Sequence, residues 1–273
     1  MITLTLISDY FIFLDLTPYE IILLCMELIF IFLWSLNISH FAQRRKTDKS
    51  KVVLYILLTS IFYTFGVIQA VDILGLDQWS EPIFTYKLSA AYGVAVIFST
   101  LASFFFYSFG LEVFGKDPRK AKRSKFWFGI FDFPAGIMVC LGKITRPYWT
   151  QEVFGLMPLN DILFFLGFGI HFIATLFLGI FLFINFSKLA KVSDTRIDRV
   201  SFRLMSLSGV AVVVSYLLWI TEGLIPATAS EVSPIGIAGW GVALVISVSM
   251  YLGYAQPKFF KNWFKEREIR IRT

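Results

Sequence analysis

Two ionisable side chains stand inside long apolar stretches of this sequence, where a membrane would surround them. His171 lies in the run 161–185, which otherwise holds apolar, small or Thr side chains between its polar ends. Glu27 lies in the apolar run that follows Pro18. At about 1.5 Å per residue, the carboxyl would be roughly 13 Å and the imidazole roughly 15 Å from the outer ends of their helices. Ionisable groups at such depth normally face the bundle interior and mark functional sites.

If both side chains face inward, the carboxylate of Glu27 and the imidazole of His171 could meet. They would then form a pair that responds to pH or to a ligand, or a proton relay. The alternative is structural: His171 is bonded to a backbone carbonyl or a hydroxyl, and Glu27 is protonated and bonded to a neighbouring helix. The sequence leaves both interpretations open.

Further polar and aromatic residues are expected near the outer mouth: Gln69, Asp72, Lys87, Trp219, Glu222 and Trp240. Gln69 and Asp72 are three residues apart, and so are Trp219 and Glu222, which places each pair on one helix face. With the deeper acid and imidazole, these faces predict an outward-facing cavity with aromatic walls, a composition typical of small-molecule pockets. The alternatives are interfacial snorkelling for the charges and an aromatic belt for the tryptophans.

Asp132 lies in the run F-D-F-P-A-G, close to the expected cytoplasmic end of its stretch. Pro134 would kink the helix there. Lys125, seven residues before Asp132, shares nearly the same helix face and is expected to form a structural pair with the carboxylate. The alternative is a hinge at Asp132 and Pro134 that moves when the outer cavity is occupied.

Seven apolar stretches must position these residues. The chain of 273 residues is 57% hydrophobic and 16% charged, whereas soluble domains carry about 25% charged residues. We therefore expect an all-α fold, a single seven-helix transmembrane domain over residues 1–273. The spans are expected at about 18–41, 52–74, 83–113, 126–141, 161–186, 204–224 and 234–254.

The basic residues predict the direction of the chain. All but three of the 25 Lys and Arg fall in the loops after the first, third and fifth stretches and in the tail; the exceptions are Lys87, Lys143 and Arg146. The positive-inside rule then places the N-terminus outside and the C-terminus in the cytoplasm of a cell-membrane protein. The net charge of +6 indicates contact with anionic lipid rather than nucleic acid.

The tail after the last stretch predicts a short amphipathic helix. It reads K-F-F-K-N-W-F-K, with Phe259, Phe260, Trp263 and Phe264 on one helical face and lysines beside them. Such a helix lies in the plane of the inner membrane interface. The alternative is a frayed polar tail.

Several chemistries are disfavoured by what the stretches lack. The last stretch, 234–254, has no lysine that could hold retinal. The chain has two histidines, whereas a catalytic zinc site needs about three protein ligands. No G-x-S-x-G, H-E-x-x-H or phosphate-binding loop occurs. We therefore expect no catalytic residues, no metal and no cofactor, and a membrane enzyme is the least favoured class.

The topology and the run M-Y-L-G-Y-x-x-P-K-F-F at 250–260 resemble the N-terminal seven-helix sensor region found ahead of prokaryotic and archaeal histidine kinases. No kinase, HAMP or coiled-coil segment follows, so the resemblance implies a stand-alone receptor-like unit whose signalling partner is a separate cytoplasmic protein. The sequence identifies neither the ligand nor the oligomeric state.

The leading hypothesis is therefore a sensor with an outward-facing polar cavity. The alternative is a small proton- or ion-coupled transporter that uses Glu27 and His171 as a relay, although such transporters commonly contain internal repeats and none is evident. A continuous polar path from the level of Glu27 to Asp132 would favour transport. Apolar side chains that close the cavity below Glu27 would favour sensing.

Overall fold

The structure, a computed structural model, describes residues 18–76, 82–144, 152–153, 157–224 and 233–264. Side chains within 18–20, 69–92, 143–157 and 222–232 lie outside the described part. Four residues expected near the outer mouth belong to that group: Gln69, Asp72, Lys87 and Glu222.

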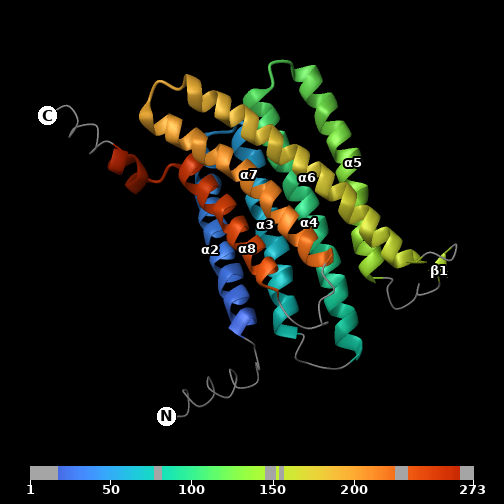
Figure 1. The fold of residues 1–273 in the computed structure, drawn as a ribbon. Coiled ribbons are helices and arrows are strands. Elements are labelled where there is room, and N and C mark those ends of the chain that lie inside the picture. Colours follow the sequence, from blue (N-terminus) through green and yellow to red (C-terminus); the bar gives the residue numbers. More distant parts are fainter. Residues whose placement is uncertain (1–17, 77–81, 145–151, 154–156, 225–232, 265–273) are drawn as a thin grey trace, which may run out of the picture.

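Seven long helices make up almost all of the described chain (Figure 1). They are α2 (Pro18–Thr47), α3 (Lys51–Leu76), α4 (Pro82–Phe114), α5 (Pro118–Ile144), α6 (Leu159–Val192), α7 (Arg196–Leu224) and α8 (Pro234–Met250). The strands β1 (Glu152–Val153) and β2 (Met157–Pro158) form a short antiparallel pair before α6. Within the described residues, these seven helices are long and apolar enough to cross a membrane, which confirms a multi-pass membrane protein.

The helices extend further than the predicted spans, and the largest differences lie at one end of the bundle. There α2 ends at Thr47 rather than 41, α5 begins at Pro118 rather than 126, α6 ends at Val192 rather than 186, and α7 begins at Arg196 rather than 204. The connections after α2, α4 and α6 gather at this end, together with the short helix 258–264 (Figure 1). We call it the basic end. The predicted spans are shorter because a fall in hydropathy marks only the point where a helix leaves the hydrocarbon. These helices continue beyond that point into water, where they carry long Lys and Arg side chains.

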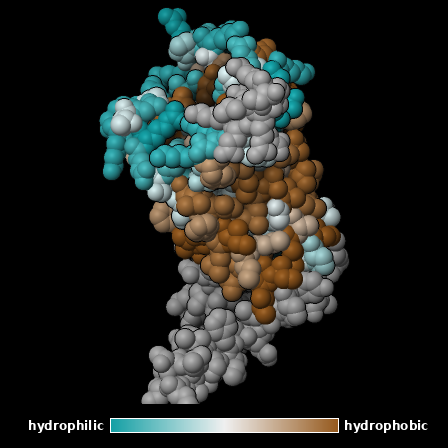
Figure 2. Space-filling model, turned by 90° about the vertical axis from the view of Figure 1, so that its left-hand side faces the viewer, coloured by the Kyte–Doolittle hydropathy of each residue, from teal (hydrophilic) through white to brown (hydrophobic). Residues whose placement is uncertain are grey.

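The helices form a closed ring. Each long helix packs against the next one in the chain, and α2 also packs against α8. The outside of the ring carries exposed apolar side chains such as Phe32, Phe126 and Phe165, each more than half exposed. Figure 2 shows this apolar belt below a hydrophilic cap at the basic end. An exposed belt of this size indicates a lipid bilayer around the ring.

Glycines bring α6 very close to both of its neighbours. A Cβ added at Gly167 of α6 would lie 2.6 Å from the Ala135 carbonyl oxygen of α5. Between α6 and α7, a Cβ added at Gly179 would lie 2.6 Å from the Gly209 carbonyl oxygen. Small residues at such crossings allow backbones to touch. Helix α6 is therefore fixed between α5 and α7, and this fixes the side chains that it projects inward.

A π-helical turn, η1 (Tyr251–Ala255), ends α8. Gln256 follows in the left-handed conformation, with φ 46°, and redirects the chain into helix 258–264. The predicted amphipathic helix is present, but two of its four aromatic side chains are buried and two are exposed. Phe260 and Phe264 are buried against the protein, whereas Phe259 and Trp263 are 63% and 50% exposed.

Candidate functional site

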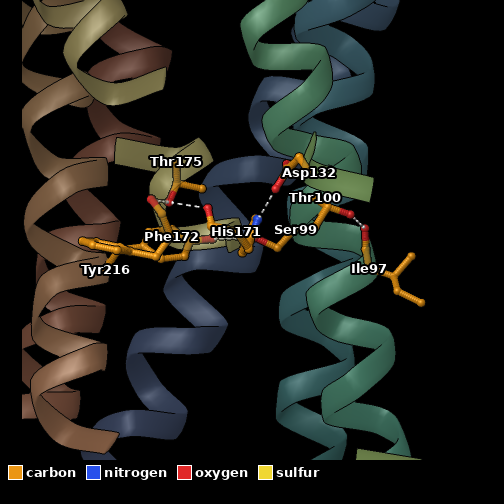
Figure 3. Close-up of polar contacts among 8 residues, drawn as sticks. All are labelled: Ile97, Ser99, Thr100, Asp132, His171, Phe172, Thr175 and Tyr216. Carbon is orange, nitrogen blue, oxygen red and sulfur yellow. Dashed lines mark hydrogen bonds and ion pairs between the residues drawn. The ribbon is translucent and has the colours of Figure 1, made fainter. Parts of the chain in front are cut away.

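His171 is the centre of a buried polar cluster at the middle of the ring (Figure 3). Its Nδ1 lies 2.7 Å from Oδ1 of Asp132, and its Nε2 lies 2.9 Å from the Tyr216 hydroxyl and 3.3 Å from Oγ of Ser99. The hydroxyls of Ser99 and Tyr216 are 2.7 Å apart. We call Ser99, Asp132, His171 and Tyr216 the His171 cluster. It joins four helices, because its members come from α4, α5, α6 and α7.

The cluster has a defined polarity. A carboxylate only accepts hydrogen bonds, so a bond to ionised Asp132 requires the tautomer of His171 in which Nδ1 carries the proton. That bond orients the imidazole and leaves Nε2 facing the two hydroxyls. Asp132 is fully buried and His171 is 1% exposed. The carboxylate of Asp132 therefore lies behind the imidazole of His171. The hydroxyls of Ser99 and Tyr216 form the accessible side of the cluster.

A cavity of about 360 Å³ begins at that accessible side. Its polar lining includes Ser99, His171 and Tyr216, together with Tyr63 and with Ser215, whose hydroxyl donates to the Val212 carbonyl within α7. Most other lining groups are apolar or aromatic, among them Phe30, Phe62, Phe168, Trp219 and Trp240. Trp219 and Trp240 lie near the ends of α7 and α8 that are remote from the basic end, so the cavity occupies the half of the ring away from it. The volume falls in the usual range for small-molecule sites, about 300–1,000 Å³.

The tryptophans form one aromatic wall. The Trp219 ring packs edge-on against Trp240, with centroids 5.6 Å apart, and against Tyr216 at 5.3 Å. Gly239 leaves room for this wall, because a Cβ there would lie 2.6 Å from Nε1 of Trp219. Three residues expected from the sequence at a cavity, His171, Trp219 and Trp240, therefore do line one.

The pairing of His171 with Glu27, which the sequence left open, is not the one that the structure shows. His171 is paired with Asp132, and Lys125, the expected partner of Asp132, instead lies 2.6 Å from Glu112. Two facts explain the difference. Helix α5 is next to α6 in the ring, whereas α2 packs mainly against α3 and α8. Because α5 begins at Pro118, Asp132 lies about halfway along it rather than near the basic end.

The remaining predicted residues are placed as follows. Glu27 is buried, with 2% exposed, but does not line the cavity, and its Oε2 has no hydrogen-bond partner among the described residues. Pro134 lies inside the continuous helix α5 with an exposed side chain. Ser99 and Tyr216 were missed, because a single hydroxyl in an apolar helix is too common to single out.

Glu27→Gln is expected to change the free energy of unfolding by less than about 1 kcal/mol. A buried group without a partner contributes no pairing energy that the substitution could remove. Reversible unfolding in mixed detergent micelles measures the change. A loss well above that value would show that the carboxyl has a partner outside the described residues.

The order Asp132–His171–Ser99 also resembles the charge relay of serine hydrolases. Two features speak against acyl transfer. Tyr216 is closer to Nε2 than Ser99 is, and Ser99 lies inside α4, where neighbouring backbone N–H groups bond within the helix. Asp132 and His171 also supply two ligands where a zinc site needs about three. The geometry therefore does not favour acyl transfer by Ser99.

A fluorophosphonate reagent, which phosphonylates activated serines with loss of fluoride, tests this interpretation. We expect no labelling of the protein above the background of a Ser99→Ala variant, measured by intact-protein mass spectrometry. Labelling that depends on both Ser99 and His171 would reverse the conclusion.

The His171 cluster and its aromatic cavity therefore have to be interpreted from their own chemistry. Comparisons of the chain with protein-family models, with curated proteins and with solved structures found no match.

Proposed function

We propose that this chain is a receptor-like membrane protein that binds a small, mostly apolar molecule with one hydrogen-bonding group. The apolar part would lie between Phe62, Trp219 and Trp240, and the polar group would bond to Ser99 or Tyr216. The observation that carries the proposal is the cavity whose polar lining includes the accessible side of the His171 cluster.

Packing below the cluster supports sensing. Between the cluster and the basic end, every helix except α5 contributes a large side chain less than 2% exposed: Trp34, Ile56, Phe106, Phe109, Leu178, Leu182, Phe186, Met205 and Met250. We call this set the inner apolar layer. It fits a cavity that is closed toward the basic end, as a receptor requires.

The His171 cluster supplies a way to transmit occupancy. A ligand bonded to Tyr216 or Ser99 competes for the hydroxyls that now face Nε2 of His171. A change there acts on Asp132 and hence on α5, which contacts α6 through Gly167. The ligand would favour one of two helix packings by binding it more tightly.

The basic end would face the cytoplasm, with the N-terminus outside, following the positive-inside rule. In a cell membrane, that face would contact anionic lipid and a separate cytoplasmic signalling protein. The cavity would then open toward the outside.

Analysis of co-purifying molecules tests the proposal. Organic extracts of the purified protein are compared, by mass spectrometry, with extracts of Ala243→Phe, which fills the cavity from α8. We expect a small molecule that is enriched in the parent and absent from the variant. Equal thermal unfolding of the two proteins is the control, and an extract that does not change with the variant would contradict the proposal.

A second candidate is proton- or ion-coupled transport, and one observation favours it. Several buried polar atoms have no hydrogen-bond partner among the described residues, among them Nε1 of Trp34, Oδ1 of Asn37, Oγ of Ser108, Oδ2 of Asp132 and Oγ of Ser247. Internal water would satisfy such atoms and could carry protons. The relay would then use His171 with Asp132 rather than with Glu27.

Proton flux in liposomes distinguishes the candidates. We expect reconstituted protein to pass no protons above the leak of empty liposomes when a pH gradient is imposed. Flux that Asp132→Asn abolishes would favour transport.

A further inference from the structure

A second hollow, of about 890 Å³, lies at the basic end, between the first turns of α7 and helix 258–264. Four basic side chains line it: Arg196, Arg199, Arg203 and Lys261. We call it the basic pocket. It shares no lining residue with the aromatic cavity. An inference from it rests on the proposed function in one respect, since that function places the basic end against anionic lipid.

The walls of the basic pocket are fixed by contacts on both sides. Nε2 of Gln256 donates to Oγ of Ser201 at 2.9 Å, which ties the end of η1 to α7. Gly253 allows this approach, because a Cβ there would lie 2.8 Å from the Ser201 carbonyl oxygen. The guanidinium of Arg196 lies 5.9 Å from the centre of the buried Phe264 ring. The pocket therefore exists before any ligand arrives.

Its positive charge is not neutralised within the described part of the chain. None of the four basic residues forms a salt bridge there, and Asp194 is the single acidic residue in the lining. The nearby Asp198 is engaged in the helix cap, since the Thr195 hydroxyl donates to its Oδ2 at 2.6 Å. Arg199 donates from one Nη to the Ser193 carbonyl oxygen at 3.0 Å, which leaves its charge unpaired. Guanidinium groups that line one pocket recognise phosphate, to which arginine donates in pairs.

The position of the pocket indicates which phosphate is available. It lies where α7 passes from its basic first turns into its apolar stretch, the depth at which lipid headgroups are found. Phe259 and Trp263, on the same short helix, are 63% and 50% exposed, as expected for side chains that enter a membrane interface. We propose that the basic pocket binds the phosphate of an acidic phospholipid whose acyl chains lie against Phe259 and Trp263.

Native mass spectrometry of the full chain in neutral detergent tests the proposal, with phosphatidylglycerol and phosphatidylcholine as added lipids. The double variant Arg199→Gln/Arg203→Gln should bind phosphatidylglycerol about thirtyfold more weakly, the combined contribution of two cations at an anionic headgroup. Lys122→Gln/Arg123→Gln removes the same charge from an exposed part of α5 and should leave binding unchanged. Arg199→Lys/Arg203→Lys, which retains the charge, should recover most of the affinity.

Two further measurements distinguish binding of the lipid from binding of soluble phosphate. Phe259→Ser/Trp263→Ser should weaken phosphatidylglycerol binding and leave binding of inorganic phosphate unchanged. The proposal is overturned if the Arg199→Gln/Arg203→Gln protein, folded as judged by its thermal unfolding, binds phosphatidylglycerol as the control variant does. Inorganic phosphate that binds as tightly as the lipid would also overturn it.

Discussion

Gly167→Ala is expected to destabilise the protein by about 1–3 kcal/mol, the usual cost of overpacking a closely packed contact. The new methyl group would lie 2.6 Å from the Ala135 carbonyl oxygen and 2.9 Å from the Val139 amide nitrogen. Both are backbone atoms of α5, so the helices must separate. Because Gly167 is one turn from His171, the separation also lengthens the bond between His171 and Asp132. Unfolding in mixed micelles measures the loss.

Gly169→Ala is the matched control, two residues further along the same helix. No atom lies within 4 Å of a Cβ built there, so the substitution meets open space. Alanine in place of glycine favours a helix by about 0.5–1 kcal/mol, so this variant should be slightly more stable than the parent. Equal destabilisation by the two substitutions would show that contact between α5 and α6 is not what Gly167 provides.

His171→Leu is expected to destabilise the protein by about 3–5 kcal/mol, because it leaves the Asp132 carboxylate buried without its partner. Asp132→Leu should cost less, about 1–3 kcal/mol, because a neutral imidazole can remain bonded to Tyr216 and Ser99. The double variant should cost clearly less than the sum of the two, since well-packed apolar side chains replace a buried pair with little loss.

A double-mutant cycle in mixed micelles provides the measurement. Additive losses would mean that Asp132 and His171 do not interact in the folded protein. We expect His171→Leu to cost more than Asp132→Leu, because the imidazole keeps its bonds to the two hydroxyls when the carboxylate is removed. Equal losses of stability for the two single variants would contradict this expectation.

The sequence was sufficient to predict seven membrane-crossing helices, because the signal is strong for each one. An apolar run with a basic segment at one end marks every span, and the residues where α2, α4 and α8 begin lie within one residue of the expected positions. It did not predict how far α2, α5, α6 and α7 continue at the basic end. The Lys and Arg residues at 119–125 lower the hydropathy, so the predicted span begins after them, but the helix includes them.

The site was predicted in its parts and not in its pairing. His171 was expected at a cavity because an ionisable group inside a membrane helix normally faces the bundle interior. Trp219 and Trp240 were expected there as aromatic walls, Trp219 because it shares a helix face with Glu222. His171 can pair only with a carboxyl from a helix that is its neighbour in the ring. The order of the spans along the chain does not say which helices are neighbours. An error of about two turns in the start of α5 was enough to assign Asp132 to Lys125.

The most direct test of the cavity compares 2-naphthol with naphthalene, which has the same ring system without the hydroxyl. Binding is measured by tryptophan fluorescence in lipid nanodiscs, with empty nanodiscs subtracted. We expect the parent protein to bind 2-naphthol about tenfold more tightly, the value of one buried hydrogen bond, and Ser99→Ala/Tyr216→Phe to lose that preference. Tyr107→Phe is the control, because its hydroxyl bonds to Ser124 outside the cavity. A parent protein that binds both molecules alike, or a double variant that keeps the preference, would contradict the His171 cluster as the polar end of a ligand site.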